Sequence, residues 1–67
     1  MKLEYDSESD SAYLYLKEIS PGEVSQTISL NDSINIDLDS EGKTLGVEIL
    51  EAKKHLPENT IKSATLI

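Results

Sequence analysis

The sequence of 67 residues contains no cysteine, phenylalanine or tryptophan, and only one histidine, two prolines and three glycines. The absence of cysteine excludes disulfide bonds and thiolate metal sites, and His55 cannot form a zinc site alone. No apolar run approaches the length of a membrane span or a signal peptide. We therefore expect a cytoplasmic protein without a cofactor.

Positive charge is also scarce, because six basic residues stand against thirteen acidic ones and the net charge is −7. Such a surface repels phosphate backbones, so we expect no direct binding to nucleic acid. It suits a basic protein partner instead. Because no apolar segment is long enough to span a membrane, we also expect no membrane association. A core this small contributes only about 3–5 kcal/mol of net stability, so we also expect self-association, in its simplest form a homodimer.

The clearest pattern that is present runs from residue 34 to residue 50, where apolar and polar residues alternate on both sides of a glycine-containing turn. This pattern predicts a half-buried β-hairpin. A three-residue loop closed by a glycine bulge would pair Leu38 with Thr44 and place the two apolar sets on opposite faces. A register that pairs Leu38 with Leu45 places both sets on one face, and we predict that register, with Gly42 left-handed in a loop over residues 40–43.

Similar alternation predicts strands over residues 2–5, 12–17 and 24–30. In the first hairpin we expect Tyr5 opposite Ala12, and Ser20-Pro21-Gly22-Glu23 fits a type II turn. Helix-forming residues follow over 51–56. The expected fold is mainly β (α+β): a single antiparallel β-meander of about five short strands with a short C-terminal helix. One domain covers residues 1–56, and the tail over 57–67 fits either a helix or a strand.

Two groups of side chains on the polar face, three carboxylates and two tyrosines, are candidates for a functional role. The carboxylates of Asp37, Asp39 and Glu48 share the polar face of the last hairpin, and an exposed sheet face favours a contact surface over an acid–base pair. Tyr13 and Tyr15 lie on the face opposite the apolar set, where we expect Ser25, Thr27 and Ser29 as neighbours. Tyrosines there serve either as semi-exposed cross-strand packing or as interface anchors.

The acidic loop Asp6-Ser7-Glu8-Ser9-Asp10 spaces its acids as a calcium loop does, but serine replaces the required glycine and Lys17 the terminal glutamate. A loop that caps its own backbone explains this segment better. The sequence therefore predicts no catalytic, cofactor-binding or metal-binding residues. It predicts a candidate interaction surface made of Asp37, Asp39, Glu48, Tyr13 and Tyr15.

Several motifs together resemble a known family. They are Tyr5-Asp6, Asp10 and Tyr13 near the start, followed by Asp37, Asp39, Gly42, the run from Leu45 to Leu50, and Ala52. In this order they resemble the small bacterial proteins grouped as domain of unknown function 2283, over roughly residues 1–56. The family brings no catalytic residues to transfer. Its members are regarded as candidate antitoxins encoded beside small RNase-like toxins, so the resemblance implies a protein-binding role.

Two classes of function remain open from the sequence. The first is a protein-interaction module, in its most concrete form an antitoxin-like neutraliser of a basic RNase-type toxin. The second is a ligand-binding or weakly enzymatic dimer with a cleft at its interface, although the chain lacks a phosphate loop, a nucleophile motif and a metal cluster. A purely structural dimer is the third and simplest alternative.

Overall fold

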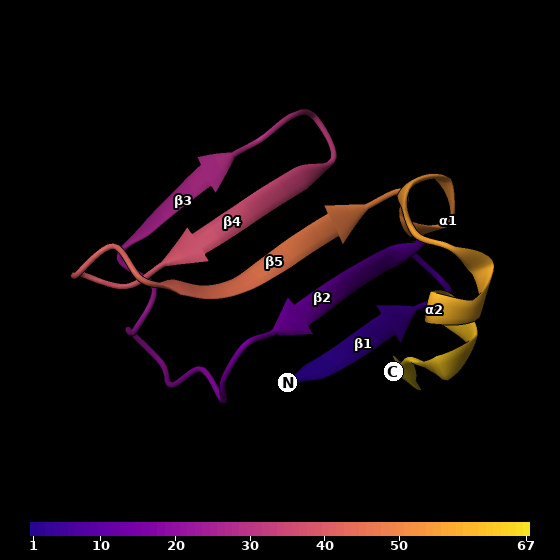
Figure 1. Ribbon diagram of the computed structural model, residues 1–67, viewed down its shortest axis with the longest axis horizontal. Helices are drawn as coiled ribbons and strands as arrows, with labels where there is room; N and C mark the ends of the chain where they lie inside the picture. Colours follow the sequence, from indigo (N-terminus) through magenta and orange to yellow (C-terminus); the bar gives the residue numbers. More distant parts are fainter.

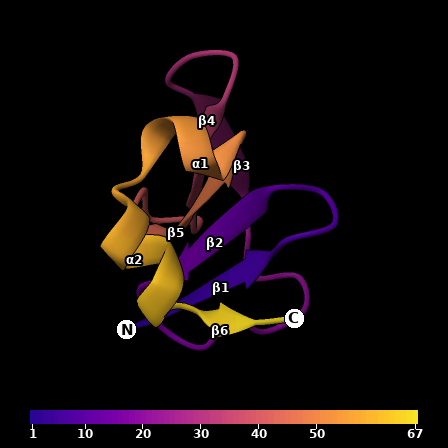
Figure 2. The same cartoon turned by 90° about the vertical axis from the view of Figure 1, so that its right-hand side faces the viewer.

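The computed structural model describes residues 1–67. Six strands form one sheet and two short helices follow the fifth strand (Figure 1 and Figure 2). The strands are β1 (Lys2–Asp6), β2 (Ser11–Tyr15), β3 (Gln26–Ser29), β4 (Ile34–Leu38), β5 (Thr44–Leu50) and β6 (Thr65–Leu66). The helices are α1 (Ala52–His55) and α2 (Glu58–Ser63). The fold is mainly β and broadly α+β, as predicted.

The order of the strands is β3-β4-β5-β2-β1-β6, so the prediction of a simple meander is wrong. β2 pairs with β5 rather than with β3. The segment between β2 and β3 carries the chain across to the far edge of the sheet, and its Ser20–Glu23 turn has the predicted form, with Gly22 at φ +81° and Glu23 N donating to Ser20 O. This order makes the longest strand, β5, central, where its alternating apolar side chains contact neighbours on both sides.

The sheet is mixed rather than purely antiparallel, because β6 runs parallel to β1. Pro57 lies directly before α2, and its carbonyl accepts the amide hydrogens of Thr60 and Ile61. After α2 the chain becomes extended, and Ile67 N donates to Tyr5 O at 3.0 Å. The tail that the sequence left open therefore contributes both a helix and an edge strand.

The register of the first hairpin is the predicted one, with Tyr5 opposite Ala12 and Leu3 opposite Leu14. The β4–β5 hairpin is partly different from the prediction. Ile34 pairs with Ile49 and Ile36 with Val47 as expected, but Leu38 pairs with Thr44 because the ladder shifts by one residue after Asp37.

A bulge explains this shift. Asp39 N donates to Lys43 O and Gly42 N to Asp39 O, with Gly42 at φ +81°, which is the three-residue loop that alone would misplace the apolar residues. Leu45 is then the extra residue on β5, and it restores the register in which the apolar residues share one face. The bulge therefore allows the tight β4–β5 turn and still keeps the apolar side chains of the hairpin on one face.

The core lies on the apolar face of β1, β2 and β5. Its buried cluster is Tyr5, Ala12, Ile49 and Ala52. Figure 2 shows that both helices lie on one side of the sheet. Leu56 follows α1 and Ile61 belongs to α2, and both pack against this cluster from above. No helix covers the outer strands β3 and β4, and Ile28 of β3 is therefore 44% exposed. The sheet therefore has one covered half and one open half.

Candidate functional site

Pairing across the sheet arranges the polar face into two rows of side chains. The first row runs through Ser29, Asn35, Glu48, Tyr13 and Glu4, each opposite the next on the neighbouring strand. The second row runs through Thr27, Asp37, Gly46, Tyr15 and Lys2. These rows bring Tyr13, Tyr15, Asp37 and Glu48 together on β2, β4 and β5.

Gly46 makes the central contact between the rows possible. A Cβ atom at position 46 would overlap the ring of Tyr13, at 2.6 Å from its hydroxyl oxygen. Because Gly46 has no side chain, the ring of Tyr13 lies across β5 and reaches β4. The bulge at Leu45 directly precedes this glycine.

Asp37 is the centre of a hydrogen-bond network. The Tyr13 hydroxyl donates to Asp37 Oδ2 at 2.5 Å, and Thr27 Oγ1 donates to Asp37 Oδ1 at 2.6 Å. Both carboxylate oxygens are therefore fixed by neutral hydroxyl groups from two different strands. Hydrogen bonds to an ionised group are shorter and stronger than those between neutral groups.

Glu48 is held in a similar way. Asn35 Nδ2 donates to Glu48 Oε1 at 2.9 Å, and Ser29 Oγ donates to Asn35 Oδ1 at 2.6 Å. Neither Asp37 nor Glu48 forms an ion pair, since the lysines that pair with acids contact other carboxylates. Two partly buried carboxylates thus lie without a cation paired to them.

This environment raises the pKa values of Tyr13 and Tyr15. Burial, followed by the hydrogen bond to Asp37, raises the pKa of Tyr13 far above its ordinary value of 10.0. Burial and then the neighbouring Glu4 carboxylate raise the pKa of Tyr15. The two rings lie against each other with centroids 4.6 Å apart. Both hydroxyls therefore stay protonated near neutral pH and act as hydrogen-bond donors, not as bases.

The structure places Asp39 apart from this group. Its Oδ1 accepts the backbone amides of Glu41 and Lys43, each at 2.9 Å. The hydrogen bond from the Lys43 amide is the main cause that lowers the pKa of Asp39. Asp39 thus fixes the β4–β5 loop, and its carboxylate is occupied by the chain's own backbone.

The carboxylates of the first acidic loop also accept hydrogen bonds from the chain itself. Asp6 Oδ1 accepts the Glu8 amide at 2.9 Å, while Asp10 Oδ1 accepts the Tyr5 hydroxyl and the Lys53 amide. Asp10 thereby ties the loop to the core tyrosine and to the start of α1. No group of three or more histidine, aspartate or glutamate side chains is arranged to hold a metal ion.

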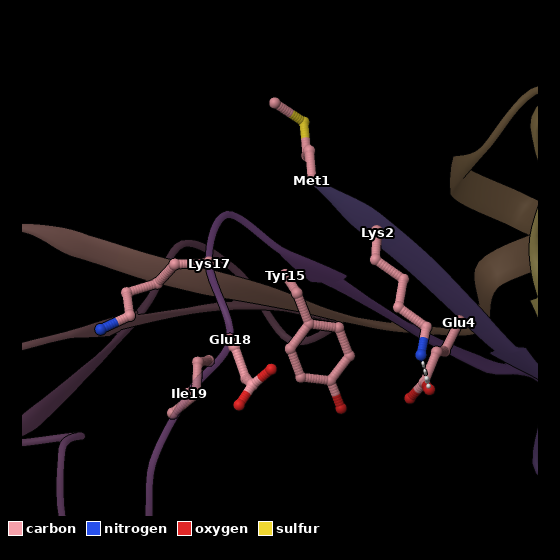
Figure 3. Close-up of a pocket in the computed structure, with 7 residues that line it drawn as sticks. All are labelled: Met1, Lys2, Glu4, Tyr15, Lys17, Glu18 and Ile19. Atoms are coloured by element: carbon pink, nitrogen blue, oxygen red, sulfur yellow. Dashed lines mark ion pairs between the residues drawn. The ribbon is translucent and has the colours of Figure 1, made fainter.

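A shallow pocket of about 340 Å³ opens where the first residues meet the segment after β2 (Figure 3). Lys2 Nζ lies 3.1 Å from Glu4 Oε2, and Lys17 pairs with Glu23. The positive charges beside the pocket are therefore already offset by carboxylates. The residues that line it are Met1, Lys2, Glu4, Tyr15, Lys17, Glu18 and Ile19.

Two parts of the polar network were not predicted from the sequence, namely Glu4 and the contact between Gly46 and Tyr13. The expectation that Ser25, Thr27 and Ser29 lie beside the tyrosines is wrong, because β2 pairs with β5 and not with β3. Thr27 instead reaches Tyr13 only through Asp37. The correct strand order would have revealed both rows by simple counting along the ladders.

A comparison with protein-family models matches residues 2–53 to the family described as protein of unknown function, DUF2283. The match covers most of the chain, so the chain belongs to this family. No curated protein and no solved structure matches the chain. Neither of the two helices is long and apolar enough to span a membrane.

Proposed function

We propose that this chain is a protein-interaction module whose polar sheet face binds a basic protein. The observation that carries the proposal is the pair of carboxylates, Asp37 and Glu48, held in place by neutral donors with no cation beside them. Because the hydrogen bonds already fix these side chains, little conformational entropy is lost when a partner binds. Arginine and lysine side chains of a partner would supply the missing positive charge.

We further propose that the partner is an RNase-type toxin, so that the chain acts as its antitoxin. An RNA-binding groove is lined by basic side chains that contact phosphates. A chain with a net charge of −7 would be steered toward that groove and would occupy it in place of RNA. Tyr13 and Tyr15 border the carboxylates and add ring area to the contact, as tyrosines do at interfaces. The expectation attached to the family resemblance supports this choice of partner.

Co-expression with a basic RNase-type protein encoded beside this chain tests the proposal. The wild-type chain should restore growth. The double variant Asp37→Asn, Glu48→Gln keeps the size of both side chains and removes two of the seven net negative charges, so it should rescue poorly. A matched control, Glu8→Gln with Asp32→Asn, removes two exposed charges from loops elsewhere and should rescue like the wild type.

Binding measured with the purified proteins gives the second readout. The complex should weaken as salt concentration rises, because screening acts on charge attraction across the interface. If the double variant rescues growth as well as the control does, the carboxylate pair does not mediate neutralisation. If the wild-type chain itself gives no rescue and no binding, the antitoxin role is wrong.

A further inference from the structure

β3 leaves one edge of the sheet without any covering element (Figure 1). All four of its residues are exposed. The segment Val24–Leu30 contains no charged residue and no proline, although 28% of the chain is charged. Natural proteins normally protect an exposed edge strand with charge, proline or a covering loop. This edge has none of these protections.

The backbone of β3 presents free hydrogen-bonding groups on this edge. Leu30 N donates to Ile34 O at 2.8 Å. In an antiparallel ladder the bonded pairs alternate, so Gln26 and Ile28 also direct their backbone groups to β4. The N–H and C=O groups of Thr27 and Ser29 therefore point away from β4, toward the open edge.

We propose that β3 pairs with β3 of a second copy of this chain, antiparallel, to form one continuous sheet across a two-fold axis. In the register that uses the free groups, Thr27 of one protomer faces Ser29 of the other, and the two exchange hydrogen bonds. Ile28 then lies directly opposite its own symmetry copy, at the close spacing of a non-hydrogen-bonded pair. The same contact is made twice, as a closed dimer requires.

The uncharged segment Val24–Leu30 offers no attraction to a charged partner, and it lets two acidic copies of this chain meet without charges facing each other at this edge. β3 itself has no carboxylate, and the one carboxylate on the neighbouring strand β4 is Asp37, which forms no ion pair. The two β4 strands of the dimer would be separated by three strand spacings, about 14 Å, which exceeds the screening length of about 8 Å at physiological salt. Repulsion between the two Asp37 carboxylates is thus weak.

The accessible surface area of the chain also supports pairing along β3. The accessible surface of the chain is 4645 Å², against about 4200 Å² for a typical monomer of this mass. Apolar side chains beside the proposed contact contribute to this surface, since Val24, Ile28 and Leu30 are 40%, 44% and 66% exposed. Pairing along β3 removes apolar area of these side chains from water.

The axis of such a dimer is perpendicular to the sheet, so both polar faces point the same way. The networks around Asp37 of the two copies would then form one extended acidic surface. The pairing itself does not depend on the basic partner proposed above, because it uses the backbone of β3 and its apolar neighbours.

Cysteine cross-linking tests the register, and the natural absence of cysteine gives a clean background. In the Ile28→Cys variant the two Cα atoms would lie about 4.5 Å apart, within the range of a disulfide. We expect a covalent dimer after mild oxidation. The matched variant Leu30→Cys should stay uncrosslinked, because the two Leu30 positions would be offset by four residues, about 13 Å.

A second pair of variants tests the hydrogen bonds. Ser29→Pro removes an N–H from the open edge and leaves the bonds to β4 in place, whereas Ser29→Ala keeps that N–H. Loss of two hydrogen bonds per dimer should weaken association roughly 30-fold in Ser29→Pro. Ser29→Ala should associate like the wild type in analytical ultracentrifugation.

Three results would overturn the proposal. The first is a wild-type chain that stays monomeric up to millimolar concentration, which would leave the edge to a strand of another protein. The second is a dimer that Ser29→Pro does not weaken, which would place the interface elsewhere. The third is equal cross-linking of the Ile28→Cys and Leu30→Cys variants, which would exclude this register.

Discussion

The two halves of this sheet are built differently. The covered half consists of β1, β2, β5 and β6 with the two helices, and all the buried hydrophobic side chains belong to it: Tyr5, Ala12, Leu45, Ile49 and Ala52. The open half consists of β3 and β4, where no hydrophobic side chain is buried. Stability is therefore concentrated in one half, and the other half is available for contacts.

The polar network joins the two halves. Tyr13 belongs to the covered half and Asp37 to the open half, and the hydrogen bond between them crosses β5 above Gly46. The acidic group proposed to bind a partner is therefore anchored to the stable part of the molecule. A small domain can in this way combine a minimal core with a rigid contact surface.

The largest expected effect comes from the core. Ile49→Ala removes a side chain that is 7% exposed and should cost about 2–4 kcal/mol, because it leaves a cavity. Ile28→Ala, with a side chain that is 44% exposed, should cost less than about 1 kcal/mol in the dilute protein. Urea denaturation measures both, and equal losses would contradict the division into two halves.

Gly46→Ala should have the next largest effect, about 1–3 kcal/mol, because the added methyl displaces the ring of Tyr13 from Asp37. In a Tyr13→Ala background the same change should become neutral or stabilising, since alanine restricts the unfolded chain more than glycine does. A double-mutant cycle by urea denaturation measures this reversal. Additive losses would show that the ring does not occupy the space above Gly46.

Alkaline pH should act on the tyrosine that joins the halves. Tyr13 holds its proton in the folded chain beyond the pH near 10 at which the unfolded chain releases it. The unfolded state then binds fewer protons, so this contribution to stability is complete below about pH 10 and is lost as pH rises further. Tyr13→Phe should show a shallower decline in urea midpoints above pH 10 than the wild type, and an identical decline would refute the assignment.

Asp39→Asn should have the smallest effect, confined to the β4–β5 loop. The pKa of the Asp39 carboxyl is lowered in the folded chain, so its contribution is present above the unfolded value near 3.9 and is lost as pH falls through the folded value. Thermal unfolding at several pH values should show a deficit at neutral pH that disappears in acid. A deficit that persists in acid would indicate damage unrelated to the charge.

Local patterns in the sequence were sufficient to predict individual hairpins. Alternation gave the β1–β2 register, and the Pro21-Gly22 pair gave the type II turn, because both depend on neighbouring residues. The strand order was not predicted, because the ten residues between β2 and β3 contain no pattern that indicates which strand lies beside β2. The polar rows depend on that order, so Tyr13, Asp37 and Glu48 could be chosen as exposed polar residues but not connected. Asp39 looked equivalent to Asp37, and only the loop geometry separates them.

Amide hydrogen exchange of the full chain, at low and at high protein concentration, tests the open edge of β3 most directly. We predict slow exchange for β2 and β5 at both concentrations. The amides of Thr27 and Ser29 should exchange quickly in the dilute protein and slowly in the concentrated protein, because only pairing between copies protects them. Protection of these two amides in the dilute chain, or rapid exchange at both concentrations, would contradict the account of β3 as an open edge that pairs with its own copy.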